Sequence, residues 1–278
     1  NYAALLCNLG EIVEANYYCK LAAILKPSLS DTYNNHGLVL FKLGNIEYAA
    51  MQYGRGLKIN AMSPVFYANL GVALKEQQLF KGAQQNYFKS VILDPQNHET
   101  FNNLGILYNL LNHKKRTKEF YIRSIILKCD YPAPYSNYGK ALFDQYEYKR
   151  SLKIYRKAIL LSPNFYEAYN NQGVSLKNLN RMDDAIKSYD RATICHPQMT
   201  SAFSNKLMLL NYTNDYKQLA QLFAFSIDEV NSYLYKGSVP QFLKSQQQFF
   251  NQFYSWERRK GEWTNFLEGL LHEKRSKF

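Results

Sequence analysis

The sequence predicts an all-α fold, a solenoid of helical hairpins that repeat every 34 residues. The first observation is a recurring word that begins with an aromatic residue, has Asn third and ends in Gly. Its copies are "YNNHG" at 33–37, "YANLG" at 67–71, "FNNLG" at 101–105, "YSNYG" at 135–139 and "YNNQG" at 169–173. A period of this length is typical of stacked repeats, which grow by addition rather than around one core. The second observation is that each unit contains two helical stripes.

The first stripe begins each unit. The full units start at residues 30, 64, 98, 132 and 166, and we number the positions within each unit from 1 to 34. Positions 4, 7, 8 and 11 then have the i, i+3, i+4, i+7 spacing of the buried face of a helix. Position 8, where a small residue lets another helix approach, is always glycine: Gly37, Gly71, Gly105, Gly139 and Gly173.

The second stripe occupies positions 20, 24 and 27 and predicts a second helix. Positions 20 and 27 hold mostly small residues, and we expect the large side chain at position 24 to fill the space beside them. Proline at position 32 ends the unit, because it cannot continue a helix. Position 24 is always tyrosine: Tyr53, Tyr87, Tyr121, Tyr155 and Tyr189.

The same numbering divides the whole chain. It predicts a partial repeat at 1–29 and a degenerate first helix at 200–212, in which Leu207 replaces the glycine. Residues 213–278 lose the period and predict a helical C-terminal cap or linker rich in aromatic residues, since a solenoid needs a closed end. The full repeats are 30–63, 64–97, 98–131, 132–165 and 166–199.

These columns resemble those of tetratricopeptide repeat (TPR) proteins over residues 1–212. The resemblance implies a right-handed superhelix whose first helices line a concave groove. Pentatricopeptide arrays that read RNA are the nearest rival, but they repeat every 35 residues, and no pair of base-reading polar positions recurs here.

Composition excludes several classes of protein. With 46% hydrophobic residues and no apolar run near the roughly 18 residues of a membrane span, we expect a soluble chain. Four cysteines without CxxC spacing indicate reduced thiols and a reducing, cytoplasmic compartment. No Gly-rich phosphate loop or nucleophile–base spacing is present, so we predict no catalytic, cofactor or metal site in these residues. The chain begins at Asn1 inside a repeat, so we expect a fragment.

The net charge of +12 leaves a basic nucleic-acid-binding solenoid as an alternative. Most cations of the repeats lie in the predicted second helices and turns, as in "HKKRTKE" at 113–119. Such a distribution is typical of a solvated face, and nucleic acid is therefore not the partner we favour.

The candidate binding site is a column of asparagines at position 6. This position lies about 200° around the helix from position 4 and so faces away from the hairpin partner. Position 9, mostly apolar, lies beside it and comprises Leu38, Val72, Ile106, Lys140 and Val174. The asparagine ladder comprises Asn35, Asn69, Asn103, Asn137, Asn171 and Asn205, with Asn1 in the partial repeat.

A carboxamide offers one acceptor and two donors, which match the C=O and N–H of an extended backbone. We therefore predict a protein-interaction scaffold that holds an extended or disordered polypeptide in the groove. The alternative role for these asparagines, hydrogen bonding between adjacent repeats, stays open and is compatible with the first. The oligomeric state also stays open, with the aromatic C-terminal helices as a candidate contact.

The ladder narrows the resemblance further. It is similar to the TPR superhelix of O-GlcNAc transferase and its SPINDLY relatives, and "SNKLMLLNY" at 204–212 resembles the segment where those enzymes enter their catalytic domain. That resemblance implies a substrate-recognition arm whose catalytic domain lies outside this fragment. The clamp that binds chaperone tails in other TPR proteins needs Lys or Arg at position 5, which here is Asn, Ala or Ser. We therefore do not expect a chaperone tail as the partner.

Overall fold

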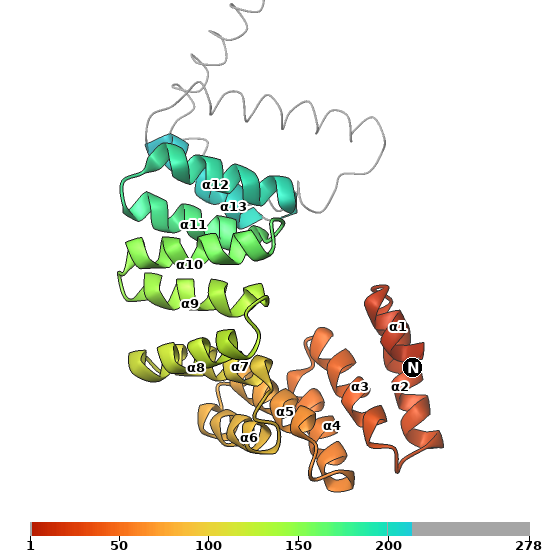
Figure 1. The fold of residues 1–278 in the computed structure, drawn as a ribbon. Coiled ribbons are helices and arrows are strands. Elements are labelled where there is room, and N and C mark those ends of the chain that lie inside the picture. Colours follow the sequence, from red (N-terminus) through yellow and green to blue (C-terminus); the bar gives the residue numbers. More distant parts are fainter. Residues whose placement is uncertain (1, 199, 213–278) are drawn as a thin grey trace, which may run out of the picture. The chain divides into compact units, whose positions relative to one another are not determined.

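The structure, a computed structural model, describes residues 2–198 and 200–212. Every regular element in these ranges is an α-helix, which confirms the predicted fold class (Figure 1). Asn1 and the predicted C-terminal cap at 213–278 lie outside the described residues. The helices are α1 (Tyr2–Asn8), α2 (Ile12–Leu25), α3 (Ser30–Lys42), α4 (Ile46–Ile59), α5 (Pro64–Glu76), α6 (Phe80–Leu93), α7 (His98–Leu110), α8 (Lys114–Leu127), α9 (Pro132–Asp144), α10 (Tyr148–Leu161), α11 (Tyr166–Asn178), α12 (Met182–Cys195) and α13 (Thr200–Tyr212).

The contacts divide the chain into two units, residues 1–179 and 180–278. In the first unit, odd-numbered helices are first helices and even-numbered helices are second helices. α3 packs on α4, α5 on α6, α7 on α8 and α9 on α10 as antiparallel hairpins. Pro64 and Pro132 stand at the first positions of α5 and α9, where the missing N–H costs nothing. The side chain of Asn97 caps α7 by accepting a 2.9 Å hydrogen bond from the Thr100 N–H.

The turn inside each hairpin has a left-handed residue at position 15. Gly10 and Gly44 adopt φ of 87° and 78° there. The following N–H returns to the carbonyl of position 11, as from Glu147 to Leu142 at 2.9 Å, which is a Schellman ending. The same left-handed backbone is imposed on residues with a Cβ in the other turns: Gln78, Asn112, Tyr146 and Asn180.

The glycines at position 8 and the tyrosines at position 24 interlock within hairpins. A Cβ placed on Gly37 would lie 2.4 Å from the Tyr53 ring, and one on Gly71 would lie 2.6 Å from Tyr87. Gly105 and Gly139 meet the next two tyrosines in the same way. The predicted packing of a small residue against a large one is therefore confirmed at these four hairpins. Burial raises the pKa of each tyrosine at position 24.

Successive hairpins interlock as well. A Cβ on Gly56 would lie 2.1 Å from the ring of Phe66 in the next repeat. Ser90 Oγ lies 3.1 Å from Thr100 Oγ1 across the equivalent junction. The Tyr135 hydroxyl donates to the Cys129 carbonyl at 3.0 Å, and so ties a first helix to the linker before it. Each hairpin thus buries its second face only by stacking on its neighbour.

In the second unit, α12 packs against α13. Tyr189 and Leu207 are both fully buried, so a leucine fills the place that glycine takes elsewhere. Lys206 forms an ion pair with Asp190 between the two helices.

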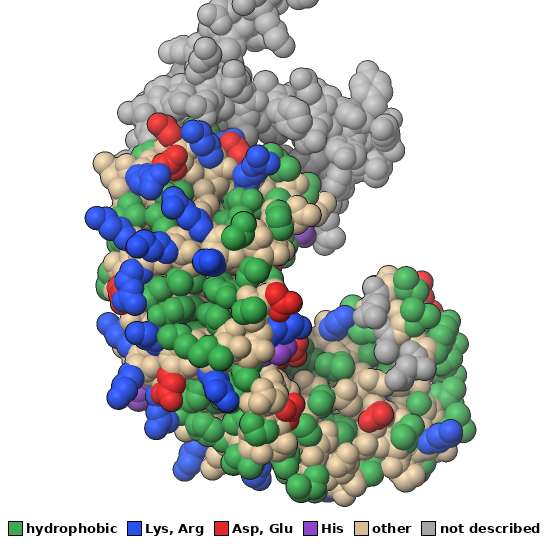
Figure 2. Space-filling model, in the orientation of Figure 1, with side chains coloured by type: hydrophobic (Ala, Val, Ile, Leu, Met, Phe, Trp, Pro, Cys, Tyr) green, Lys and Arg blue, Asp and Glu red, His purple; other side chains and the backbone are tan. Residues whose placement is uncertain are grey.

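Lysine and arginine side chains gather over α8 and α10 (Figure 2). Each helix carries five cations, against one acidic residue in α8, Glu119, and none in α10. All ten cations are exposed, which confirms the predicted distribution of charge at these two second helices.

Candidate functional site

The candidate site of the first unit is the face of α3, α5, α7, α9 and α11 that carries the ladder. Every ladder asparagine is the sixth residue of its helix and is half-buried, as is Asn205 in α13 of the second unit. At position 9, Leu38 and Lys140 are exposed, and Val72, Ile106 and Val174 are half-buried. Solvent therefore reaches a surface on which amides and apolar groups alternate.

Two members of the ladder are hydrogen bonded to the preceding hairpin. Asn69 Nδ2 donates to Asn34 Oδ1 at 2.8 Å, and Asn137 Nδ2 donates to Asn102 Oδ1 at 3.0 Å. In both pairs the acceptor is the residue at position 5 of the repeat before. These bonds join neighbouring first helices and are the structural use of the ladder that the sequence left open.

Two other members have no such acceptor. Asn103 follows a repeat with Ala68 at position 5, and among the described residues its carboxamide makes no hydrogen bond. Asn171 follows a repeat with Ser136 there, and its only side-chain hydrogen bond is a long one of 3.4 Å that it accepts from Asn170. Its Nδ2 group is therefore available within the part of the chain that the structure describes.

The ladder thus alternates with a period of two repeats, or 68 residues. The predicted ladder of six equivalent asparagines therefore lacks this alternation. A signal was present, because doublets of asparagine at 34–35, 102–103 and 170–171 are 68 residues apart, whereas position 5 between them is Ala68 or Ser136.

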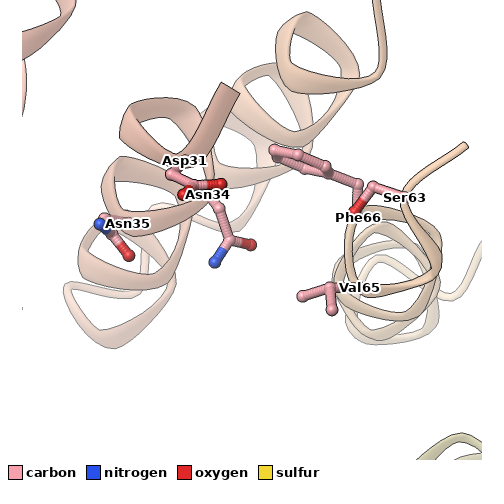
Figure 3. A pocket seen from close by; sticks show the side chains of 6 residues that line it. All are labelled: Asp31, Asn34, Asn35, Ser63, Val65 and Phe66. Carbon is pink, nitrogen blue, oxygen red and sulfur yellow. The ribbon is translucent and has the colours of Figure 1, made fainter. Parts of the chain in front are cut away.

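A pocket of about 300 Å³ opens on the same face between α3 and α5 (Figure 3). Asp31, Asn34 and Asn35 line it from α3. Val65 and Phe66 line it from the start of α5, together with Ser63 of the preceding linker. The pocket combines amide, carboxylate and apolar groups, so it can accept both a main-chain polar group and an aliphatic side chain.

Neither a metal-binding group nor a membrane-spanning helix is present in the described residues. No three His, Cys, Asp or Glu side chains in 2–198 and 200–212 are grouped to hold a metal ion. No helix in those ranges has the length and apolarity to span a membrane. Cys7 and Cys19 share a buried cluster, where burial and then the neighbouring thiol raise the pKa of Cys19 to about 11. Such a thiol stays protonated and inert at neutral pH.

Comparison with known proteins agrees with this architecture. Residues 166–193 match the tetratricopeptide repeat family. No curated protein sequence matches the chain. Its resemblance to O-GlcNAc transferase therefore stays a prediction.

Several solved structures share the fold. The Cut9–Hcn1 hetero-tetramer of the APC/C aligns with a TM-score of 0.67 and 15% identity, over 76% of this chain and 42% of that chain. PilF of Pseudomonas aeruginosa aligns with a TM-score of 0.61 and 19% identity, over 79% of this chain and 97% of PilF. TTC0263, a TPR protein of Thermus thermophilus, aligns with a TM-score of 0.60 and 16% identity, over 66% of this chain and 99% of TTC0263. With one repeat matching the family and the helical stack matching solved structures, this chain has the fold of a tetratricopeptide repeat protein.

Proposed function

We propose that the chain is a protein-interaction scaffold whose ladder face holds an extended polypeptide by its main chain. The observation that carries this proposal is the pair of available carboxamide groups, on Asn103 and Asn171, in a solvent-accessible column bordered by apolar side chains. A half-buried amide without a protein partner has lost some of its hydrogen bonds to water. A ligand that accepts or donates a hydrogen bond there replaces them. The Cut9–Hcn1 structure, an assembly of different proteins, supports the same class of function.

The spacing of the available amides suits an extended backbone. Equivalent helices of stacked repeats lie about 10 Å apart, so two repeats span about 20 Å. An extended chain advances about 3.3 Å per residue, or six residues over that distance. Six is an even number, and alternate residues present their polar groups to the same edge. The backbone edge that meets Asn103 is therefore also the edge that meets Asn171.

The apolar neighbours add affinity without strong selection. Ile106 and Val174 lie three residues beyond these two asparagines on the same helices, within reach of the side chains of a bound peptide. Main-chain contacts hold any sequence equally, so the proposed binding is broad. Each hydrogen bond contributes only about 0.5–1.5 kcal/mol, so affinity accumulates along the face.

The first prediction separates the two kinds of asparagine. The double variant Asn103→Ala/Asn171→Ala should weaken peptide binding about tenfold, because two hydrogen bonds are lost, and leave the melting temperature unchanged. The probe is a fluorescein-labelled, unstructured 18-residue peptide chosen from a random peptide array by its binding to the wild-type chain, and the measurement is anisotropy.

The matched control is Asn69→Ala/Asn137→Ala, which removes two amides of the same ladder. Loss of the bonds to Asn34 and Asn102 should lower the melting temperature. Equal peptide binding by wild type and Asn103→Ala/Asn171→Ala would overturn the proposal.

A second candidate function is the substrate-recognition arm of a glycosyltransferase. It is favoured by the segment 204–212, most of α13, together with the ladder. Sequencing the gene beyond Phe278 tests it. A catalytic domain there would support this function, and a stop codon soon after Phe278 would remove it.

A further inference from the structure

A second surface, independent of the ladder, runs across the second helices. Position 29 should be polar on an outer helix face, yet four repeats of the first unit place an aliphatic side chain there. These side chains are between 67% and 75% exposed. Single exposed apolar residues are ordinary, but a column that returns at the same position of successive repeats marks an interaction surface. The aliphatic row comprises Ile24, Ile92, Ile126 and Leu160, and Lys58 takes the place in the remaining repeat.

A row of cations accompanies the aliphatic row. Position 26 lies one turn earlier on the same face, because residues i and i+3 are neighbours on a helix. Lys89 lies 5.3 Å from the centroid of the Tyr67 ring, and Arg123 lies 5.8 Å from that of Phe101, so the rings help to fix both cations. The cationic row comprises Arg55, Lys89, Arg123 and Lys157, all exposed.

α8 and α10 each carry one residue of the aliphatic row and one of the cationic row, together with further lysines and arginines. This concentration of positive charge is visible in Figure 2. A pocket of about 320 Å³ lies on α8, where Arg123 and Ile126 meet beside Phe120. The pocket is apolar apart from one cation, Arg123, and one carboxylate, Glu119, while the rest of the charge on the two helices is positive.

We propose that the outer face of α8 and α10 docks an acidic amphipathic helix of another protein. Leucine-like side chains of that helix would cover Ile126 and Leu160, and its carboxylates would pair with Arg123 and Lys157. The charge of the surface demands an acidic partner, and its aliphatic row demands that the partner be apolar as well.

The two rows favour a helix over an extended chain as the partner. Residues three and four apart share one face of a helix, so a helix can place leucines and glutamates in adjoining rows along that face. An extended chain places successive side chains on opposite faces, so neighbouring apolar and acidic residues would not both meet the surface.

Three other occupants fit less well. Nucleic acid supplies phosphates but no aliphatic partner for the row. A bilayer offers a broad apolar surface, whereas the aliphatic row is one residue wide. Residues 213–278 of this chain carry nine Lys and Arg against seven Asp and Glu, so they supply no net negative charge.

The test uses the full chain and a designed probe, a fluorescein-labelled 21-residue helical peptide of three heptads with leucine and glutamate on adjoining rows. Wild type should bind it, and Ile126→Ser/Leu160→Ser should weaken binding at least about tenfold, because two aliphatic contacts are lost. Arg123→Gln/Lys157→Gln should weaken binding and reduce its dependence on salt.

The matched control is Leu79→Ser/Leu110→Ser, which removes two exposed leucines outside the rows and should leave binding unchanged. Equal losses in the control and in Ile126→Ser/Leu160→Ser would overturn the proposal, as would equal binding of a probe with lysine in place of glutamate. A 21-nucleotide single-stranded DNA and phosphatidylserine vesicles are tested as rival ligands. If either binds more tightly than the helical peptide, and Ile126→Ser/Leu160→Ser does not weaken that binding, the surface is assigned to that polyanion instead. Because the substituted side chains are exposed, circular dichroism should show that all variants keep the helical fold of the wild type.

Discussion

His36 illustrates how one residue departs from its column. Position 7 is Leu70 and Leu104 in the next two repeats, where it packs as an apolar group. His36 keeps the buried place, and its Nε2 donates to Asn16 Oδ1 at 3.1 Å, while its buried Nδ1 has no partner in the described part of the chain. Burial, followed by the charges of Lys20 and Arg55, lowers the pKa of this imidazole. The folded protein therefore holds His36 neutral, in the buried place that leucine takes in the next two repeats.

This lowered pKa predicts a loss of stability in mild acid. The unfolded chain takes up a proton near the ordinary value of 6.5, and the folded chain takes it up only at lower pH. Between those two values the unfolded state binds more protons, so the free energy of unfolding falls as pH falls. Urea unfolding at pH 7.5 and 5.5 measures this loss, which should be smaller in His36→Leu. An equal loss in both proteins would contradict the assignment.

At the scale of the element, the turn inside each hairpin uses one geometry with unequal residues. Position 15 is left-handed in every hairpin described, yet it is glycine only at Gly10 and Gly44. For a residue with a Cβ, this backbone costs about 1 kcal/mol or more. Tyr146 adopts it with a largely exposed ring, so the turn is formed because the two helices pack, not because the residue favours it.

Glycine should therefore stabilise the strained turns. Tyr146→Gly and Gln78→Gly should each raise the free energy of unfolding by about 1 kcal/mol, since glycine adopts positive φ without a steric cost. Chemical denaturation measures the change. Gly44→Ala is the converse control and should destabilise by a similar amount. A loss of stability in both glycine variants would show that the side chains of Tyr146 and Gln78 contribute more than their backbone strain costs.

At the scale of the whole molecule, charge is distributed unevenly over a repeating frame. The chain has a net charge of +12, and α8 and α10 of the first unit supply ten of its 34 cations. Exposed like charges on adjoining repeats repel one another in dilute salt, and salt screens that repulsion. This surface charge destabilises the free protein, and a partner of opposite charge would relieve the repulsion.

Moderate salt should therefore stabilise the free protein. Raising sodium chloride from 50 to 300 mM should increase the melting temperature by a few degrees, because the Debye length falls below the spacing of the repeats. Lys115→Glu/Lys149→Glu, on exposed positions outside both rows, should melt higher at 50 mM salt and respond less to added salt. A melting temperature that falls with salt would mean that attractive pairs outweigh the repulsion.

Much of this protein followed from its sequence alone. The 34-residue period, the two helices of each unit and the packing of Tyr53 on Gly37 or Tyr87 on Gly71 could all be predicted, because they depend on residues close in sequence and on steric size. Helical geometry also predicts that the ladder asparagines lie on the face of each first helix that points away from its hairpin partner.

Only the tertiary structure distinguished Asn69, which is bonded to the preceding hairpin, from Asn103, which is available. The difference depends on an acceptor 35 residues earlier, which reaches the ladder only when the two hairpins stack. Stacking likewise decided that Ile126 and Leu160 stay exposed, because a helix has several faces and its neighbours choose which are buried. Identical letters in a repeat thus acquire different roles from the contacts that surround them.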